Sequence, residues 1–134
     1  MDEVLYINPD SLHSSPAFSH AVRIPAGYDL VFVGGQNGTG ADGAVVGPEI
    51  AEQTRQAFQN VKTCLDAADA TLADVVKWTI LCVEGVDIQE GFAASADVLP
   101  TDSEPAVITV AIVSGLAVPG ALVELEAVAA VPAG

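Results

Sequence analysis

Positive charge is scarce in this chain of 134 residues, which has 18 acidic residues, four basic residues and a formal net charge of −14. No lysine or arginine follows Lys77. Nucleic-acid-binding proteins need basic patches against phosphates, and proteins that adsorb to anionic membranes need them against lipid headgroups. The sequence therefore excludes both kinds of partner, and its acidity indicates solubility in a salty or crowded cytoplasm. The basic residues are Arg23, Arg55, Lys62 and Lys77.

Metal-binding side chains are also few, with two cysteines and two histidines. Cys64 and Cys82 do not form a CxxC pair, and His13 and His20 lie far from both in sequence. Zinc sites need several such ligands at short, regular spacings. The sequence therefore predicts neither a metal nor a cofactor. We interpret both cysteines as buried structural thiols of a protein in a reducing compartment.

Long hydrophobic runs are missing, although hydrophobic residues make up 51% of the chain. No run reaches the roughly 18 apolar residues that a membrane-spanning helix needs. The longest, at residues 107–113, has the length of a strand. The N-terminus, Met1-Asp2-Glu3-Val4, has neither the basic nor the apolar region of a signal peptide. We therefore expect a cytoplasmic protein that does not enter a membrane.

Hydrophobic periodicity predicts one α+β domain over residues 1–134, with helices on one face of a mixed sheet. Gly47-Pro48-Glu49 opens the clearest helix, whose apolar stripe includes Cys64 and leaves Gln53 mostly outside it. Pro100 ends a second helix. Strands are expected at 4–7, 18–24, 30–33, 75–83, 106–113 and 121–129, helices at 50–68 and 88–99, and a glycine-rich loop at 37–47.

Two of the expected strands are apolar on both faces, which bears on assembly. A sheet covered by helices on one face and by water on the other should alternate apolar and polar residues. Residues 30–33 and 107–113 do not alternate in this way. A chain this short has no further elements to cover the second face, so the sequence predicts a homo-oligomer that buries it.

Four sequence blocks resemble the YjgF/RidA family: 31–36 (VFVGGQ), 50–60 (IAEQTRQAFQN), 72–77 (LADVVK) and 123–129 (VELEAVA). Their order and spacing fit along nearly the whole chain, from about Val4 to Val131. The resemblance implies a chorismate-mutase-like fold and a homotrimer with a central β-barrel and outer helices. It also implies small-molecule clefts between adjacent subunits.

Active members of that family hydrolyse enamines and imines derived from amino acids, releasing ammonia and a keto acid. Their arginine follows a proline-alanine step and grips the substrate carboxylate through two parallel hydrogen bonds. Here the step is Pro105-Ala106 and the next residue is Val107. The resemblance therefore implies a divergent member that is not a standard 2-iminobutanoate/2-iminopropanoate deaminase.

The remaining cleft positions of the family can be carried over residue by residue. A family serine before Gly-Gln is Gly34 here, and a small serine or cysteine aligns with Ile108 or Thr109. Glu124 matches the residue thought to position or activate water, so it is the candidate catalytic residue. The candidate ligand-binding residues are Phe18 (a tyrosine in the family), Gly34, Gly35, Phe92 (an asparagine in the family), Val107 and Thr109.

Each of these residues also has a plainer interpretation. Glu124 is either a general acid or base, or a carboxylate that is solvated or bonded to a neighbouring subunit's backbone. Phe18 and Phe92 either line the cleft or pack in the core, and Gly34-Gly35 also fits a turn that ends a strand. Arg23 is the one cation that we considered as a substitute for the missing arginine.

These observations favour a divergent RidA-like homotrimer that binds a neutral or weakly polar metabolite, or a partner protein, at its subunit interfaces. The alternative is an imine or related C–N hydrolase that uses Glu124 and water on a substrate without a carboxylate. A third possibility is a purely structural trimer without a ligand. Position 107 separates the first two, because losing the arginine weakens binding of carboxylates.

Overall fold

The computed structural model describes residues 3–134. Met1 and Asp2 lie outside the described residues; they begin the N-terminal segment that lacks the features of a signal peptide. The element order matches the predicted order of strands and helices. The strands are β1 (Leu5–Ile7), β2 (Ala21–Arg23), β3 (Tyr28–Asn37), β4 (Val75–Val83), β5 (Val107–Val113) and β6 (Val123–Pro132), and the helices are α1 (Ile50–Ala67), the 3-10 turn η1 (Leu72–Asp74) and α2 (Ile88–Ser95).

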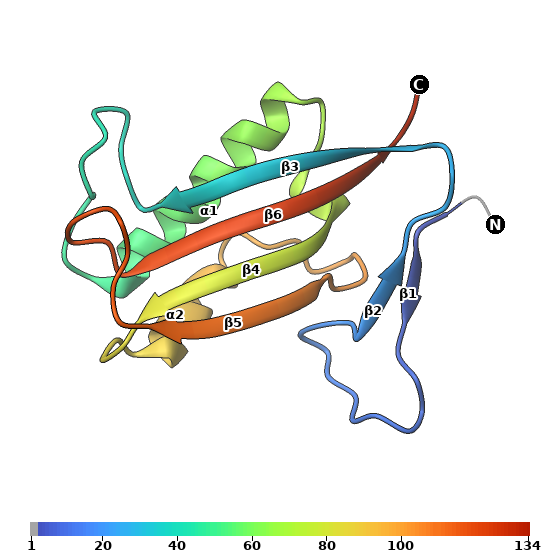
Figure 1. Cartoon of the computed structure of the whole chain (residues 1–134), viewed down its shortest axis with the longest axis horizontal. Coiled ribbons are helices and arrows are strands. Elements are labelled where there is room, and N and C mark those ends of the chain that lie inside the picture. Colours follow the sequence, from blue (N-terminus) through green and yellow to red (C-terminus); the bar gives the residue numbers. More distant parts are fainter. Residues whose placement is uncertain (1–2) are drawn as a thin grey trace.

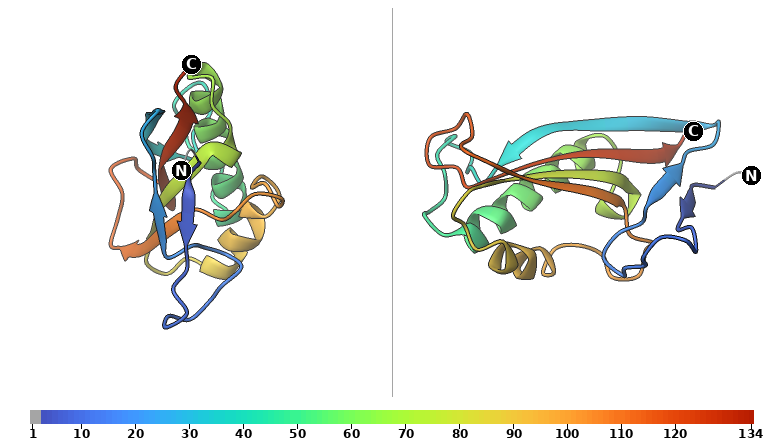
Figure 2. Two further views of the ribbon diagram at one scale, coloured as in Figure 1. Left: turned by 90° about the vertical axis from the view of Figure 1, so that its right-hand side faces the viewer. Right: turned by 60° about the horizontal axis from the view of Figure 1, so that its bottom comes forward.

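Four strands form the main sheet in the order β3-β6-β4-β5 (Figure 1). β6 pairs antiparallel with both β3 and β4, whereas β4 and β5 are parallel, so the sheet is mixed. β1 and β2 form a separate antiparallel pair beside it. Both helices lie on the same side of the main sheet (Figure 2). This confirms the predicted α+β fold with two helices on one face.

The core lies between α1 and the covered face of the sheet. Phe58 of α1 meets Trp78 of β4 edge-on, with ring centroids 5.0 Å apart. Val61, Leu65 and Leu125 are fully buried between the helix and the strands. Aromatic and branched side chains at helical and alternating spacing therefore supply most of the apolar burial that holds this face together.

Two predictions about α1 are wrong. Gln53, expected mostly outside the apolar stripe, is fully buried. Its side-chain amide donates to the carbonyls of Gly47 (2.7 Å) and Gly120 (3.1 Å), and its oxygen accepts from the Leu122 N–H (2.8 Å). These bonds satisfy the amide away from water. Cys64, expected to be buried, is exposed beyond the edge of the stripe, whereas Cys82 on β4 is buried as predicted.

Several boundaries differ from the prediction. β3 continues through Gly34 and Gly35 to Asn37, because β6 pairs with it on both sides of the glycines. The second strand is shorter than expected, because the segment before Ala21 is a loop, and α2 ends at Ser95 rather than near Leu99. None of the helices within residues 3–134 is both long and apolar enough to cross a membrane.

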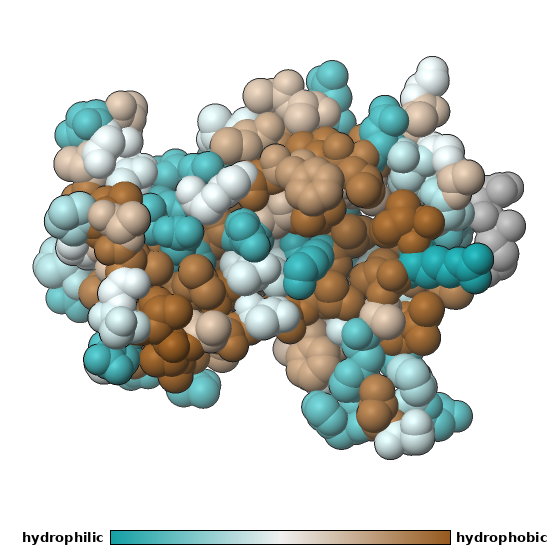
Figure 3. All heavy atoms as spheres, in the orientation of Figure 1, coloured by the Kyte–Doolittle hydropathy of each residue, from teal (hydrophilic) through white to brown (hydrophobic). Residues whose placement is uncertain are grey.

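The face of the sheet opposite the helices is uncovered in the single chain, and we call it the open face. Leu30 and Phe32 project onto it from β3, and Phe32 is 74% exposed. Apolar surface gathers over the strands on this face, interrupted by hydrophilic side chains (Figure 3). The apolar residues that motivated the prediction of an oligomer thus do lie unburied in one chain.

Candidate functional site

Glu124, the candidate catalytic residue, lies on the open face of β6, where it is partly buried. Val123 and Leu125 on either side of it point into the core, which confirms the predicted alternation of this strand. The amide of the buried Asn37 donates to the Glu124 carboxylate (3.4 Å) and to the Val123 carbonyl (3.0 Å). Asn37 therefore holds the carboxylate in place from the neighbouring strand.

One of the two adjacent glycines of β3, Gly35, makes room for that carboxylate. The pairing of β3 with β6 shifts between Val33 and Gln36, so Gly34 and Gly35 form a bulge. A Cβ on Gly35 would overlap the Glu124 carboxylate, whereas a Cβ on Gly34 would meet no other atom within 4 Å. The close approach of backbone and carboxylate thus depends on glycine at position 35, because a side chain there would push the end of the Glu124 side chain aside.

Polar side chains of α1 fix the loops that flank Glu124. Asn60 donates to the carbonyls of Asn37 (3.1 Å), the last residue of β3, and of Thr39 (2.8 Å) just after it. Gln53 bonds to Gly120 and Leu122, just before β6. Gly38 packs so closely on α1 that a Cβ there would collide with the Gln53 backbone. The helix therefore anchors both strand ends that position the carboxylate.

Val107 and Thr109 project from β5 onto the same open face. β4 separates β5 from β6, so these two side chains begin roughly 10 Å from those of β6, two strand spacings away. Val107 occupies the position at which the resemblance implies an arginine. Within one chain, Glu124 therefore faces neither Val107 nor Thr109 directly.

Lys77 is a residue near this site that the sequence analysis did not single out. Lys77 lies on β4, where it pairs with Val107 of β5 and with Val128 of β6. Its side chain therefore lies on the same open face as theirs. It is the one lysine or arginine on the described strands of the main sheet. Arg23, considered from the sequence as a substitute cation, lies on β2 outside the main sheet. Only the pairing of β4 with β5 shows that Lys77, and not Arg23, lies beside Val107.

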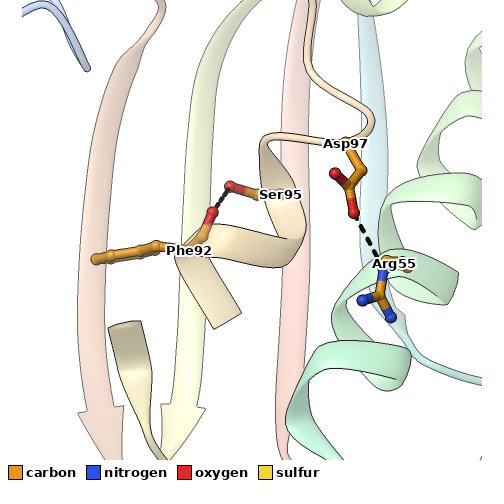
Figure 4. A network of polar contacts seen from close by, with 4 residues as sticks. All are labelled: Arg55, Phe92, Ser95 and Asp97. Atoms are coloured by element: carbon orange, nitrogen blue, oxygen red, sulfur yellow. Dashed lines mark hydrogen bonds and ion pairs between the residues drawn. The ribbon is translucent and has the colours of Figure 1, made fainter. Parts of the chain in front are cut away.

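Phe18 and Phe92 lie elsewhere, beside a cavity of about 760 Å³ on the helix side of the sheet. Figure 4 shows Phe92 projecting from α2 across the strands and away from the Arg55–Asp97 ion pair. Both phenyl rings line the cavity together with Trp78 and Ile108. The structure of one chain therefore separates the seven candidate residues into an open-face group and a helix-face group.

Ser19 holds the loop that carries Phe18. It is buried, its hydroxyl donates to the Pro105 carbonyl (2.6 Å), and its backbone N–H donates to the Ala106 carbonyl (3.1 Å). His20 adds a contact between its Nε2 and the His13 carbonyl (2.6 Å), and its ring packs edge-on against Phe18. The start of β5 and the N-terminal loop are thus joined at the cavity wall.

Two side chains have raised pKa values. Burial raises the pKa of the Tyr6 hydroxyl, and the nearby carboxylates of Glu104 and Asp74 and the Tyr28 phenol raise it further. Burial alone raises the pKa of the Cys82 thiol. Both groups are therefore held in their neutral forms. Among residues 3–134, no group of three or more His, Cys, Asp or Glu side chains could hold a metal ion.

The architecture defines a small α+β protein with a helix-covered mixed sheet and a carboxylate on its open face. The sequence profile of the family described as Endoribonuclease L-PSP matches residues 9–131. The chain therefore belongs to this family, whose solved members are called YjgF or Rid proteins. This confirms the resemblance drawn from the four sequence blocks.

Solved relatives cover almost the whole chain. The Rid-family protein YyfB from Yersinia pestis is 30% identical, with a TM-score of 0.83 over 98% of this chain and 100% of its own. Rv2704 from Mycobacterium tuberculosis, of the YjgF/YER057c/UK114 family, is 31% identical, with a TM-score of 0.65 over 96% of this chain and 100% of its own. Protein HMF1 of Saccharomyces cerevisiae is 32% identical over 85 residues, 60% of this chain and 64% of HMF1.

Proposed function

We propose that this protein is a Rid-family homotrimer that binds a neutral or weakly polar small molecule at clefts between subunits. The observation that carries the proposal is Val107, an apolar side chain on the open face at the position of the family's carboxylate-binding arginine. Glu124, held by Asn37 and Gly35, supplies a fixed hydrogen-bond acceptor in the same cleft. A ligand with a donor group suits that acceptor better than an anion does.

Assembly would complete the cleft. In one chain, β4 lies between the strand of Glu124 and the strand of Val107 and Thr109. A neighbouring subunit seated on the open face would bring a second set of these residues close to the first. The exposed Leu30 and Phe32 supply apolar surface for such a contact, which the single chain leaves in water.

The charges on this face disfavour a carboxylate ligand. A charge-assisted hydrogen bond contributes about 1.5–3 kcal/mol, so replacing a bidentate arginine by valine costs about 3 kcal/mol or more, at least roughly 100-fold in affinity. Glu124 and Glu126 add negative charge to the face where the ligand would lie. Imines derived from amino acids carry a carboxylate and are therefore poor candidates.

Cleavage of RNA, which the family's description names, is also disfavoured by charge. Two of the four cations form ion pairs on exposed helix surface, Arg55 with Asp97 and Lys62 with Asp66. Arg23 lies on β2 and Lys77 on β4, so the cations do not form a patch that could follow a phosphate backbone. We also infer a cytoplasmic location, because an exposed free Cys64 suits a reducing compartment.

A second candidate function is hydrolysis of an imine, favoured by the position of Lys77. Lys77 of β4 is the cross-strand partner of Val107, and its ammonium group extends from the open face. It can attract one carboxylate as a point charge, although it cannot form the two parallel hydrogen bonds of a guanidinium. In this alternative, Glu124 accepts a proton from the attacking water and passes it to the imine nitrogen, which forms a tetrahedral carbinolamine. The hydroxyl proton of that intermediate then moves to the amino group as the C–N bond breaks, so that ammonia leaves and a carbonyl forms.

The deciding experiment generates imines in situ from several amino acids with an amino-acid oxidase and times their hydrolysis. We expect the wild-type protein not to accelerate hydrolysis, because Val107 cannot hold the carboxylate. We expect Val107→Arg to accelerate it, and we expect Val107→Arg combined with Glu124→Gln to lose that gain. Val113→Arg, on the same face at the far end of β5, serves as the matched control.

The outcomes separate the candidates. Acceleration by the wild-type protein that disappears in Lys77→Met would overturn the proposal and establish the hydrolase. No gain in Val107→Arg, with the trimer intact, would show that the open-face cleft is not the family's reaction site. Equal gains in Val107→Arg and Val113→Arg would show a nonspecific effect of added positive charge.

A further inference from the structure

Thr54 of α1 carries a buried hydroxyl to which no other group of residues 3–134 bonds. Thr54 is 4% exposed, and its Oγ1 has no hydrogen-bond partner within the described part of the chain. Thr63, further along the same helix, shows the usual arrangement, because its hydroxyl donates to the Gln59 carbonyl one turn back (3.0 Å). A buried hydroxyl without a partner is costly, so Thr54 requires a partner that the chain itself does not supply.

Thr54 lines a small cavity between the two helices and the sheet. The volume of this cavity is about 20 Å³, whereas a single water molecule needs roughly 10–15 Å³ of such space. Each helix and the sheet contribute to its wall, with Ile50 and Thr54 from α1, Gly91 and Ser95 from α2, and Cys82 and Leu125 from the sheet. Cys82 and Leu125 do not line the larger cavity that contains Phe18, so the small cavity extends over a part of the sheet that the larger one does not reach.

Two other groups in the wall of the small cavity can bond a polar molecule. The Ser95 hydroxyl donates to the Phe92 carbonyl (2.7 Å; Figure 4), and its oxygen keeps lone pairs that can accept a hydrogen bond. Cys82 presents a buried thiol, and burial raises its pKa, so this group stays neutral. Among the described residues, no charged side chain lines the cavity. A very small neutral molecule that both donates and accepts hydrogen bonds therefore fits it.

We propose that this cavity is a binding site for one ordered water molecule, which bridges α1 and α2. The Thr54 hydroxyl donates to the water oxygen, and the water donates one proton to the Ser95 oxygen and the other to the Cys82 sulfur. A buried water usually makes about three hydrogen bonds, which these groups supply. The site lies on the helix side of the sheet and involves neither Glu124 nor Val107, so it is independent of the proposed function.

X-ray diffraction from crystals of the wild type and of Gly91→Ala locates the water directly. A Cβ on Gly91 would lie 3.6 Å from Thr54 Oγ1 and 3.4 Å from Ile50 Cγ1, so alanine fits there and occupies space beside the hydroxyl. We expect one density peak per chain within hydrogen-bonding distance of Thr54 Oγ1 in the wild type, and its loss in Gly91→Ala. Gly34→Ala, whose Cβ would meet no atom within 4 Å, is the control that should keep the peak.

Two threonines of α1 provide a matched pair of variants for a test in solution. Thr54→Val nearly keeps the shape of the side chain and removes the hydroxyl that holds the water. Hydrogen exchange of the α2 backbone amides should then become about fivefold faster, the change that corresponds to the loss of one hydrogen bond. Thr63→Val is the same substitution at an exposed position of the helix, and it should leave the exchange of α2 unchanged.

The opposite results would overturn the proposal. If the Thr54 hydroxyl had no partner in a dry cavity, Thr54→Val would unfold at a higher temperature than the wild type, because it removes an unpaired buried group. Wild-type crystals without a peak beside Thr54 Oγ1, or with xenon bound there under pressure, would likewise show a dry apolar cavity. Equal exchange of α2 in the wild type and Thr54→Val would contradict the bridge. If Thr54→Val fails to fold, diffraction from the wild type and Gly91→Ala still decides.

Discussion

The two faces of the four-stranded sheet are built from alternate residues of the same strands, yet in a single chain one face is buried and the other is largely exposed. On the helix face, Val123 and Leu125 of β6 are buried against α1. On the open face, Glu124 and Glu126 alternate with them, and Phe32 of β3 is 74% exposed. One face is therefore covered by the chain's own helices, whereas the other is uncovered in the single chain.

The largest expected effect separates the stability of the two faces. Leu125→Ala leaves a cavity in the closed core and should lower the free energy of unfolding by about 3 kcal/mol at any protein concentration. Phe32→Ala should lower it only at concentrations where the chains associate, because the phenyl ring has little to contact in one chain.

Urea unfolding at two protein concentrations measures both variants. A loss of similar size for Phe32→Ala at the lowest concentration would mean that Phe32 stabilises the single chain. The distinction between a closed face and an open face would then fail.

The next effect sharpens the description of the open face at the Glu124 carboxylate. Gly35→Ala should lower the free energy of unfolding by about 1 kcal/mol, because its Cβ would push the Glu124 carboxylate away from Asn37. Gly34→Ala is the matched control, since its Cβ would meet no atom within 4 Å. It should change stability by less than about 0.5 kcal/mol. Thermal unfolding compares the two variants, and equal losses would show that Glu124 is not held against Gly35.

The smallest expected effect concerns the two cysteines, one on each side of the boundary between core and solvent. Cys64 should react with a thiol reagent in the native protein, whereas Cys82 should react only after unfolding.

Burial raises the pKa of the Cys82 thiol above its usual 9.0, so the folded state resists ionisation of this group. Its contribution to stability is thus present below pH 9 and is lost as the pH rises further.

Unfolding measured between pH 8 and pH 10.5 should show this loss, and Cys82→Ala should reduce the part of it that comes from Cys82. The raised pKa of Tyr6 acts in the same direction above its usual 10.0. An unchanged pH profile in Cys82→Ala would assign the alkaline loss to Tyr6 or to other groups.

Periodicity and sequence blocks were sufficient to predict the order of the elements and the side of the sheet that the helices cover. Glu124 could be assigned to the open face because Val123 and Leu125 alternate with it. Local sequence could not place Gln53, because its burial depends on three hydrogen bonds to loops far from it in sequence. The same holds for Asn37, which reaches Glu124 only through the register of β3 and β6.

The candidate cleft was predicted between subunits, so its arrangement depends on assembly. In the single chain, Phe18 and Phe92 line a cavity on the side of the sheet opposite Glu124. A residue-by-residue resemblance carries no information about which subunit, or which face, each side chain belongs to. Lys77 was overlooked because its proximity to Val107 arises from the pairing of β4 with β5.

Sedimentation equilibrium of the wild-type protein at micromolar concentration is the most direct test of the claim that the open face is completed by other copies of the chain. We predict a single species of three times the chain mass of 13.6 kDa, which Phe32→Asp shifts toward the monomer by placing a charge in the interface. A wild-type protein that sediments as a monomer at that concentration would contradict the account.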